Sequence, residues 1–479
     1  MDLAFANGKV WGELHATAVG CEGERIVVVG SDEDVREAKL VIDAHGGAII
    51  PAFNDAHVHF LMGSRSLGEL DLFGVATQDE IERRISAYAR ERDSSWIVGR
   101  GWFYSAFPGG MPAVDLLDRL IPDRPAYLES FDAHTGWANS KALTIAGVAE
   151  RDVLKEAAMY SVTKHIPKRT TEEDLDALRA GMKMAASRGI VSVQEAGDGW
   201  DQLHLWDALR ASGDLTLRVR LAFDMTPNLD EDEWRQRLDA YEEVARARAR
   251  DQWVTTGIVK AFADGVVESM TASLLEPYAG ESENRGAPLW PGDQLLRHAH
   301  IASERGWQVQ VHAIGDAAIR QALDAFEGCD RTRRHRVEHI ENPAPEDVPR
   351  FAALGVIASM QPQHSSPELI DVWRKNLGPE RALRGWPWAG ILASGGRLAF
   401  GTDWPVVPED PFASLAEAEK TLSRDDAIAA WTSGAAYAEH AESFKGSLRE
   451  GMLADIAVLD REMKKVEATA AGGRLVYEA

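Results

Sequence analysis

The chain has 479 residues and a formal net charge of −24 at pH 7, which disfavours nucleic acid and anionic membranes as partners. Apolar residues make up 45% and charged residues 27%, proportions typical of a globular protein with a large core. The length accommodates two or three domains, because a barrel of alternating strands and helices alone takes about 250 residues.

The two cysteines, Cys21 and Cys329, are too few and too far apart to indicate a disulfide framework. The N-terminal segment lacks the basic start and apolar stretch of a secretory signal, and no uncharged apolar run reaches about 18 residues. We therefore expect a cytoplasmic protein that acts on a small molecule; the sequence is also compatible with a homo-oligomer. The 15 tryptophans fit either an aromatic core or an aromatic-lined cavity.

The two ends of the chain share a pattern of short β-type segments between Gly-rich turns. Residues 1–50 contain FANGKVWG and ERIVVVG, and residues 441–479 contain GMLADIAVLD and GGRLVYEA. Neither end has enough strands to bury a core alone. We therefore expect both ends to form one composite β-sandwich.

A series of β-type runs recurs at intervals wide enough for a helix, which is typical of parallel βα units. The runs cover residues 48–60, 189–197, 216–225, 257–265, 308–316, 333–341, 355–363 and 397–406. Amphipathic stretches with apolar residues three and four apart lie between them. The pattern predicts an α/β fold, a (β/α)8 TIM-type barrel with its first strand in residues 51–61 and the remainder in residues 166–440.

The first two runs are about 130 residues apart, whereas one βα unit takes roughly 30. Residues 62–165 are therefore expected to form a subdomain inserted on the first βα loop. Its segments WIVGRGWFYSAF and PAYLESFDAHTGW are rich enough in aromatic residues for a small core. Because barrel active sites lie on the loops after the strands, the insertion is expected to roof the site.

Five side chains at the ends of predicted barrel strands could bind metal. His57 and His59 are two residues apart in a strand, so both point to the same face. His312, His339 and Asp403 stand at the ends of later strands, which meet at one end of a barrel. Imidazole and carboxylate donors suit Zn²⁺ best, although Fe²⁺, Mn²⁺ and Co²⁺ accept the same donors.

Lys260 lies in the apolar strand segment GIVKAFADG, on the same face as Asp264. A buried ammonium is costly, so this lysine must be paired, neutral or modified. Reaction with carbon dioxide would give a carbamate, N6-carboxylysine, that can bridge two metal ions. Pairing with Asp264 or with a substrate carboxylate is the alternative, and the number of metal ions, one or two, stays open.

These six positions together resemble the amidohydrolase superfamily, in its amidohydrolase family 3 branch. The resemblance covers nearly the whole chain and includes FDAHTGWANSKAL, VKAFADG, SMQPQH and KGSLREGMLADIAVLD. It implies a metal-containing barrel with a composite β-sandwich, in agreement with the spacing of the strands. The chain departs from the branch in a shorter segment near residues 148–156 and in Ser365, Ser366 and Pro367, where an acidic residue is frequent.

The resemblance implies two ion sites, the first held by His57, His59 and Asp403, the second by His312 and His339, with Lys260 bridging as a carbamate. A metal-bound water with a pKa of about 7 would attack a carbonyl, and Asp403 would pass its proton to the leaving amine. The expected reaction is hydrolysis of a non-peptide C–N amide bond in an N-formyl or N-acyl amine. A lactonase or other ester hydrolase is the alternative. A non-catalytic scaffold is disfavoured, because all six ligand positions of the family are present in this chain.

Further aromatic and histidine residues are candidates for substrate contact, with core packing or a structural role as the alternative for each: Trp102, His134, His364, Trp388 and Trp404. Glu338 is expected to point away from its neighbour His339 and to pack behind the ligands. Histidines in helices and polar segments are expected at the surface: His298, His300, His335 and His440.

Overall fold

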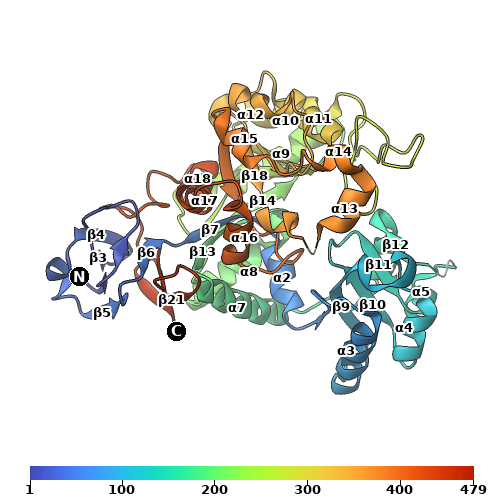
Figure 1. Ribbon diagram of the computed structural model, residues 1–479, viewed down its shortest axis with the longest axis horizontal. Helices are drawn as coiled ribbons and strands as arrows, with labels where there is room; N and C mark the ends of the chain where they lie inside the picture. The colour runs from blue at the N-terminus through green and yellow to red at the C-terminus, as the bar shows by residue number, and fades with distance from the viewer. Residues whose placement is uncertain (150–151, 368) are drawn as a thin grey trace.

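The computed structural model describes residues 1–149, 152–367 and 369–479. Figure 1 shows a central barrel with a small β unit on one side and a second α/β unit on the other. The shortened segment expected near residues 148–156 includes two positions, 150 and 151, that lie outside the described residues.

Eight parallel strands form the central sheet in chain order, and each pairs with its sequence neighbour, as predicted for a TIM-type barrel. They are β7 (Phe53–Val58), β13 (Ile190–Glu195), β14 (Arg218–Asp224), β15 (Val254–Phe262), β16 (Gln308–Ala313), β17 (Arg336–His339), β18 (Ile357–Met360) and β19 (Arg397–Phe400). Each falls within one of the predicted runs or overlaps it.

Most of the helices that belong to the barrel surround these strands and bury apolar faces against them, whereas α13 (Ile370–Leu377) and α14 (Pro379–Ala382) pack on the loop after β15. The others are α2 (Phe60–Ser66), α7 (Thr171–Ser187), α8 (Gly199–Ser212), α9 (Glu231–Ala247), α10 (Gln294–Glu304), α11 (Asp316–Phe326), α12 (Val348–Leu354), α15 (Trp388–Ala393), α16 (Pro411–Ala418), α17 (Arg424–Trp431) and α18 (Ser433–Ala438), with 3₁₀ turns η4 (Arg331–Arg333) and η5 (Pro362–Ser365). Helix α7 begins with a capping box between Thr170 and Glu173.

The barrel closes where β7 meets β19, the first and last strands of the sheet. Asp55 of β7 accepts the backbone N–H of Thr402 at 3.0 Å, and His57 O accepts the N–H of Asp403 at 2.7 Å. Beyond the strand end, the N–H of His59 donates to Trp404 O at 2.8 Å. The seam therefore holds the two segments that carry His57, His59 and Asp403 against each other.

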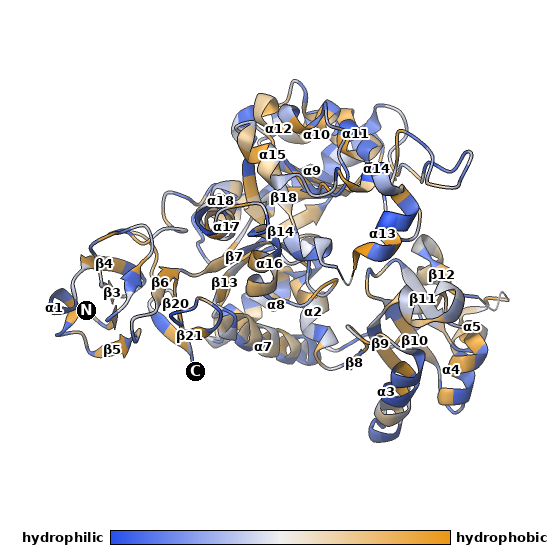
Figure 2. Ribbon diagram, viewed as in Figure 1, coloured by the Kyte–Doolittle hydropathy of each residue, from blue (hydrophilic) through white to orange (hydrophobic). Residues whose placement is uncertain are grey.

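The inserted subdomain forms its own five-stranded sheet in the order β12-β11-β10-β9-β8. Its elements are β8 (Leu70–Asp71), α3 (Gln78–Glu91), β9 (Ile97–Trp102), η1 (Tyr104–Ala106), η2 (Pro108–Gly110), α4 (Val114–Leu120), β10 (Ala126–Ser130), β11 (Thr135–Ala138), α5 (Ser140–Ala146), β12 (Leu154–Lys155), η3 (Glu156–Met159) and α6 (Tyr160–Thr163). Figure 2 shows hydrophilic stretches on α3, which lies at the outside of this unit.

The start of the inserted sheet lies later than the predicted boundary at residue 62. Helix α2 covers residues 60–66 and packs on α7, so it belongs to the barrel. The two helices approach so closely that a Cβ at Gly181 would lie 2.1 Å from Ser64 Oγ. A larger residue at Gly181 would force Ser64 to shift, so the two helices are in close contact, and the insertion proper begins after α2.

Both ends of the chain contribute to the β unit opposite the insertion, as predicted. One sheet contains β1 (Leu3–Ala6), β3 (Ala18–Glu22), β4 (Arg25–Gly30) and β5 (Leu40–Asp43), and helix α1 (Asp32–Val35) follows β4; the other sheet contains β2 (Lys9–Val10), β6 (Ala48–Pro51), β20 (Ile456–Leu459), β21 (Val466–Ala471) and β22 (Arg474–Glu478). Residues from both ends, among them Phe5, Ile49 and Val458, share one core. Neither terminal segment could bury that apolar surface alone.

Cys21 and Cys329 are both free and buried, as expected from their number and spacing. No helix in the described part of the chain is long and apolar enough to span a membrane.

Candidate metal centre

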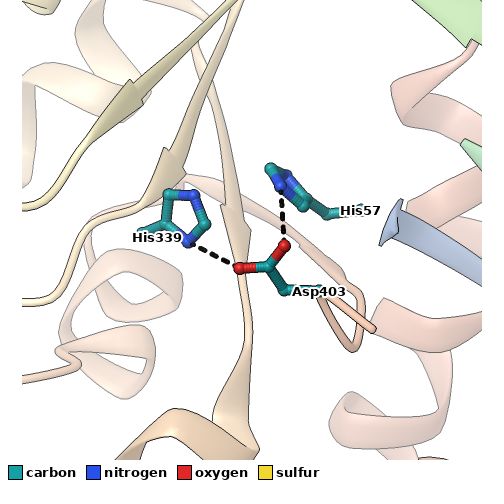
Figure 3. Close-up of side chains that lie close together, drawn as sticks. All are labelled: His57, His339 and Asp403. Carbon is teal, nitrogen blue, oxygen red and sulfur yellow. Dashed lines mark ion pairs between the residues drawn. The ribbon is translucent and has the colours of Figure 1, made fainter. Parts of the chain in front are cut away.

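Three buried side chains meet at the carboxyl end of the barrel. His57 comes from β7, His339 from the end of β17, and Asp403 from the loop after β19. One ligand atom from each lies within 4.8 Å of the other two. Figure 3 shows both imidazole rings directed at the Asp403 carboxylate, with His57 Nε2 3.4 Å from Oδ1 and His339 Nδ1 3.9 Å from Oδ2.

A buried charge network orients His57. Its Nδ1–H donates to Glu338 Oε2 at 2.6 Å, and Glu338 forms an ion pair with Arg336 at 2.9 Å. All three side chains are fully buried. The bond from Nδ1 to Glu338 fixes the ring so that His57 Nε2 faces Asp403, and a carboxylate behind the ring is the arrangement commonly found behind histidine ligands of metals.

Several atoms that face this point are buried and have no hydrogen-bond partner among the described residues. They are His57 Nε2, His339 Nδ1, Asp403 Oδ1 and Lys260 Nζ. Buried polar atoms are almost always partnered, so such a set at one place indicates a missing ligand. Two imidazole nitrogens and a carboxylate oxygen are donors that a divalent ion accepts, and the residues therefore fit a metal.

The other three predicted ligands lie around the same point but outside the tight group. His59 caps α2, with Nε2 3.6 Å from Asp403 Oδ1. The His312 ring lies 4.4 Å from the His339 ring, and its Nε2 contacts Gly265 O at 3.2 Å. Lys260 is buried, and its Nζ lies 4.4 Å from the Phe262 ring centroid.

Lys260 is not paired with Asp264, the partner considered from the sequence. Asp264 instead accepts backbone N–H groups of Ser273 at 2.8 Å and Gly315 at 2.9 Å. Burial lowers the pKa of Lys260 to about 8, so about a tenth of the amine is neutral at pH 7.

The protonation states of three histidines and of Asp403 suit metal binding. Burial lowers the pKa of His59 to about 3 and places the pKa values of His312 and His339 well below the usual value, so these rings are neutral. Burial opposes ionisation of Asp403, but His57 and His59 outweigh it and hold the pKa of this carboxyl below its usual value. Neutral imidazoles and an ionised carboxylate are the forms that bind metals.

His57 differs from these three histidines in its protonation. Burial and Lys260 oppose protonation of the His57 ring, but Asp403 and Glu338 outweigh them and raise its pKa above the usual value. A metal ion would therefore have to displace a proton from this ring.

The backbone is strained at two of the clustered residues. His339 has a φ of 72° and Asp403 a φ of 63°, both in the left-handed region. For residues other than glycine this conformation costs of order 1 kcal/mol or more and is concentrated at functional sites.

A cavity of about 260 Å³ opens onto this centre. Its lining combines barrel residues with residues 131–134 of the insertion, which therefore roofs the site. The lining includes His59, His312, His339 and Asp403, and it is otherwise mostly apolar. An enclosed, largely apolar cavity with a few polar groups is the usual form of a small-molecule site.

Of the residues suggested for substrate contact, His134 and His364 line the cavity, and His364 Nε2 lies 3.8 Å from Asp403 Oδ2. Trp102 does not line it: this side chain is buried in the core of the insertion, and its Nε1–H donates to Leu128 O at 3.0 Å. Trp404 packs on Phe60 in the barrel core. Strand alternation does not reveal which face of an inserted sheet is turned to the barrel.

None of the 15 tryptophans, all of which are in described segments, lines the cavity. Trp388, for example, is buried against Phe400 in the barrel core. The aromatic rings in the cavity lining are instead those of Phe131 and Phe262. The high tryptophan content therefore reflects core packing.

Two histidines expected at the surface are buried. His298 hydrogen-bonds to the carbonyl oxygens of Gln294 and Leu229, and His335 accepts the N–H of Val309. His300 is half-buried and His440 is exposed. The surface positions of His298 and His335 were predicted from the polar residues near them in the sequence. In the fold, backbone groups form hydrogen bonds with both rings, so the rings can be buried.

The sequence reasoning missed several acidic residues of the site. Asp55 shares the face of His57 by period-two alternation, and it binds the backbone N–H of His57 at 3.1 Å. Glu195 ends β13 and accepts the N–H of Phe60 at 2.8 Å, with its other oxygen 3.8 Å from His59 Nδ1. Both residues lie at or near the ends of barrel strands, and this position could have identified them from the sequence.

Comparison with known proteins gives concordant matches. Residues 40–477 match the family described as "Amidohydrolase family". The chain is 30% identical to Protein LONG AFTER FAR-RED 3 of Arabidopsis thaliana, over 99% of this chain and 91% of that protein. It is 25% identical to the N-substituted formamide deformylase of Arthrobacter pascens, over 93% of this chain and 90% of that enzyme.

Among solved structures, an uncharacterized metal-dependent hydrolase of Pyrococcus furiosus superposes with a TM-score of 0.74 at 26% sequence identity. The match covers 94% of this chain and 97% of that chain. The likeness extends over the whole arrangement of barrel, insertion and β-sandwich.

Proposed function

The chain belongs to the amidohydrolase family, and from that premise we propose that it hydrolyses a non-peptide C–N bond of a small amide, an N-formyl or N-acyl amine. The broader class, a metal-dependent hydrolase, has the support of the family and of the Pyrococcus furiosus relative. The amide specificity draws support from the relative that is a formamide deformylase.

One observation carries this proposal. His57 Nε2, His339 Nδ1 and Asp403 Oδ1 are buried, lack hydrogen-bond partners among the described residues and converge at a cavity that His339 and Asp403 line. A divalent ion held there, most suitably Zn²⁺, supplies Lewis-acid activation of a water and of a carbonyl. The remaining chemistry is the work of the chain's own side chains.

We assign proton transfer to Asp403. Its carboxylate is ionised at neutral pH, opens onto the cavity and has one oxygen, Oδ1, without a hydrogen-bond donor among the described residues. It can accept the proton of the attacking water and return it to the leaving amine, which would otherwise be too basic to depart. Glu338 fixes the ring of His57, and residues 131–134 of the insertion form part of the cavity wall.

We further propose that Lys260 carries a carbamate that completes the metal site. Its Nζ is buried without a hydrogen-bond partner in the described chain, and its lowered pKa makes the neutral, reactive amine available. Mass spectrometry of the native protein after bicarbonate treatment tests this assignment. The unmodified mass in a protein with a full complement of metal would contradict it.

The direct test measures metal per chain and the hydrolysis of a panel of N-formyl and N-acyl amines beside lactones. Asp403→Asn should lower kcat/KM for the amides at least about a thousandfold, since it removes both a proton acceptor and a metal donor. Asp425→Asn, at an exposed position of α17, is the matched control. Turnover of lactones alone, or an unimpaired Asp403→Asn variant, would contradict the proposal.

A further inference from the structure

The cavity at the metal centre has an acidic wall formed by Asp132, Glu268 and Glu341. Asp132 and Glu341 are 6% and 5% exposed, and Glu268 is half-buried. Among the described residues that line the cavity there is no lysine and no arginine. Three carboxyl groups therefore line one cavity without a lysine or arginine to balance them, and the cationic partner nearest to Glu341 is His364, whose Nδ1 lies 3.4 Å from Glu341 Oε1 and which is charged only when protonated.

Neutral donors hold two of these carboxylates in place. Asp132 accepts the Tyr104 hydroxyl at 3.0 Å, and Glu341 accepts Trp373 Nε1–H at 3.0 Å. The Tyr104 and Trp373 bonds orient the oxygens but supply no positive charge. The His364 ring beside Glu341 supplies one only in its protonated form. Burying carboxylates together is costly unless a cation compensates them.

Glu268 is the member of the acidic wall whose ionisation the surroundings oppose. Burial, followed by the charges of Glu341 and Asp132, raises its pKa well above the usual value. It comes from the loop that follows β15, on the side of the cavity that the insertion covers with Asp132. A cation bound between these groups would offset the repulsion of Glu268 by Glu341 and Asp132.

The spacing of the acidic wall favours an organic cation over a metal ion. Among the described residues, the group whose ligand atoms all lie within 4.8 Å is that of His57, His339 and Asp403, and the wall forms no such group. Carboxylates spread around a cavity suit a larger, less compact charge. Apolar residues Phe131 and Val266 line the same space and would contact the carbon chain that carries the charge.

The acidic wall also faces a site that is built to bind a ligand. His339 Nδ1 and Asp403 Oδ1, on residues that are 3% and 5% exposed, open onto the same cavity without partners in the described chain. Resting on the function proposed above, we infer that the substrate is a small amide whose amine portion carries a second, positively charged nitrogen. The acidic wall binds this ammonium or guanidinium group while the amide carbonyl lies at the metal centre.

A matched pair of substrates tests this inference in the metal-loaded enzyme. N-(4-aminobutyl)formamide and N-pentylformamide have the same number of non-hydrogen atoms and differ in the terminal ammonium. The wild type should favour the cationic amide about tenfold or more in kcat/KM, and Glu268→Gln should reduce that ratio about tenfold. The ratio should stay at the wild-type value in Glu283→Gln, an exposed glutamate in the same loop.

The outcomes separate this inference from the proposed function. Equal hydrolysis of the two formamides by the wild type would overturn the cationic substrate and leave amide hydrolysis standing. If neither is hydrolysed, calorimetry with choline and its neutral carbon isostere, 3,3-dimethylbutan-1-ol, tests the acidic wall without any reaction. Tighter binding of choline that is lost in Glu268→Gln supports the inference, and equal binding of the two alcohols overturns it.

Discussion

Replacement of Glu338 by glutamine tests whether a buried charge network holds His57 in place. The carboxylate is fully buried between Arg336, at 2.9 Å, and His57 Nδ1, at 2.6 Å. Burial alone would raise its pKa, but Arg336 and His57 outweigh burial and lower the pKa from 4.5 to about 2. Glutamine keeps the shape of the side chain and removes the charge.

The expected loss of unfolding free energy in Glu338→Gln follows from the lowered pKa of Glu338. A lowering from 4.5 to about 2 corresponds to about 3 kcal/mol of unfolding free energy. This value agrees with the cost of about 3–5 kcal/mol that is typical when one partner of a buried ion pair is removed. With an unfolding entropy of about 1 kcal/mol/K for a chain of this size, the melting temperature should fall by about 3 °C.

Thermal melts of the metal-free proteins, followed by circular dichroism, measure this difference. Because the pKa of Glu338 is lowered in the folded state, its stabilisation is complete above pH 4.5 and is lost as the pH falls toward 2. The difference between wild type and Glu338→Gln should therefore shrink below about pH 4.5. Glu33→Gln, which removes an exposed partner of Arg36, should change stability by less than about 0.5 kcal/mol.

Metal affinity gives a second readout of the same variant. If Glu338 orients His57, the variant should bind zinc about 10- to 100-fold more weakly in a chelator competition. Unchanged zinc affinity would refute the orienting role, even if the protein were destabilised. An unchanged melting temperature at pH 7 would refute the buried charge network itself.

Two further predictions concern the metal and the insertion. Removal of metal with a chelator should lower the melting temperature, and added zinc should restore it, because a ligand that binds only the folded state stabilises that state. An unchanged melting temperature would argue against a metal at His57, His339 and Asp403. Trp102→Ala should destabilise the inserted subdomain by about 3–5 kcal/mol, seen as faster hydrogen exchange in residues 70–155, because the side chain is fully buried there. Zinc affinity should change less than about twofold in that variant, and a larger loss would place Trp102 at the metal centre.

Much of the fold was predictable because its signals are local. Each barrel strand is a short apolar run between amphipathic helices, and every one of the eight was predicted near its observed position. The composite sandwich was predictable because each terminal segment has too few strands for its apolar residues. The boundary of the insertion was less accurate, because only the packing of α2 on α7 assigns residues 60–66 to the barrel.

The candidate site was predictable only as far as strand ends could indicate it. His57, His339 and Asp403 were identifiable because the carboxyl ends of barrel strands converge. Asp132 and Glu268 were not, since they belong to loops whose path depends on how the insertion packs over the barrel. Trp102 was misplaced for the same reason: its strand has two faces, and only packing shows which one is turned to the core of the insertion.

The sequence by itself therefore determined the barrel, the origin of the β-sandwich in both termini and a set of candidate metal donors at strand ends, because hydrophobic periodicity and strand-end positions are properties of short segments. Only the tertiary structure decided which donors lie within 4.8 Å of each other, that Glu338 orients His57, and that three carboxyl groups share one cavity. These contacts join residues from different strands and from the insertion. Their distances depend on how whole elements pack, and no local pattern in the sequence encodes that packing.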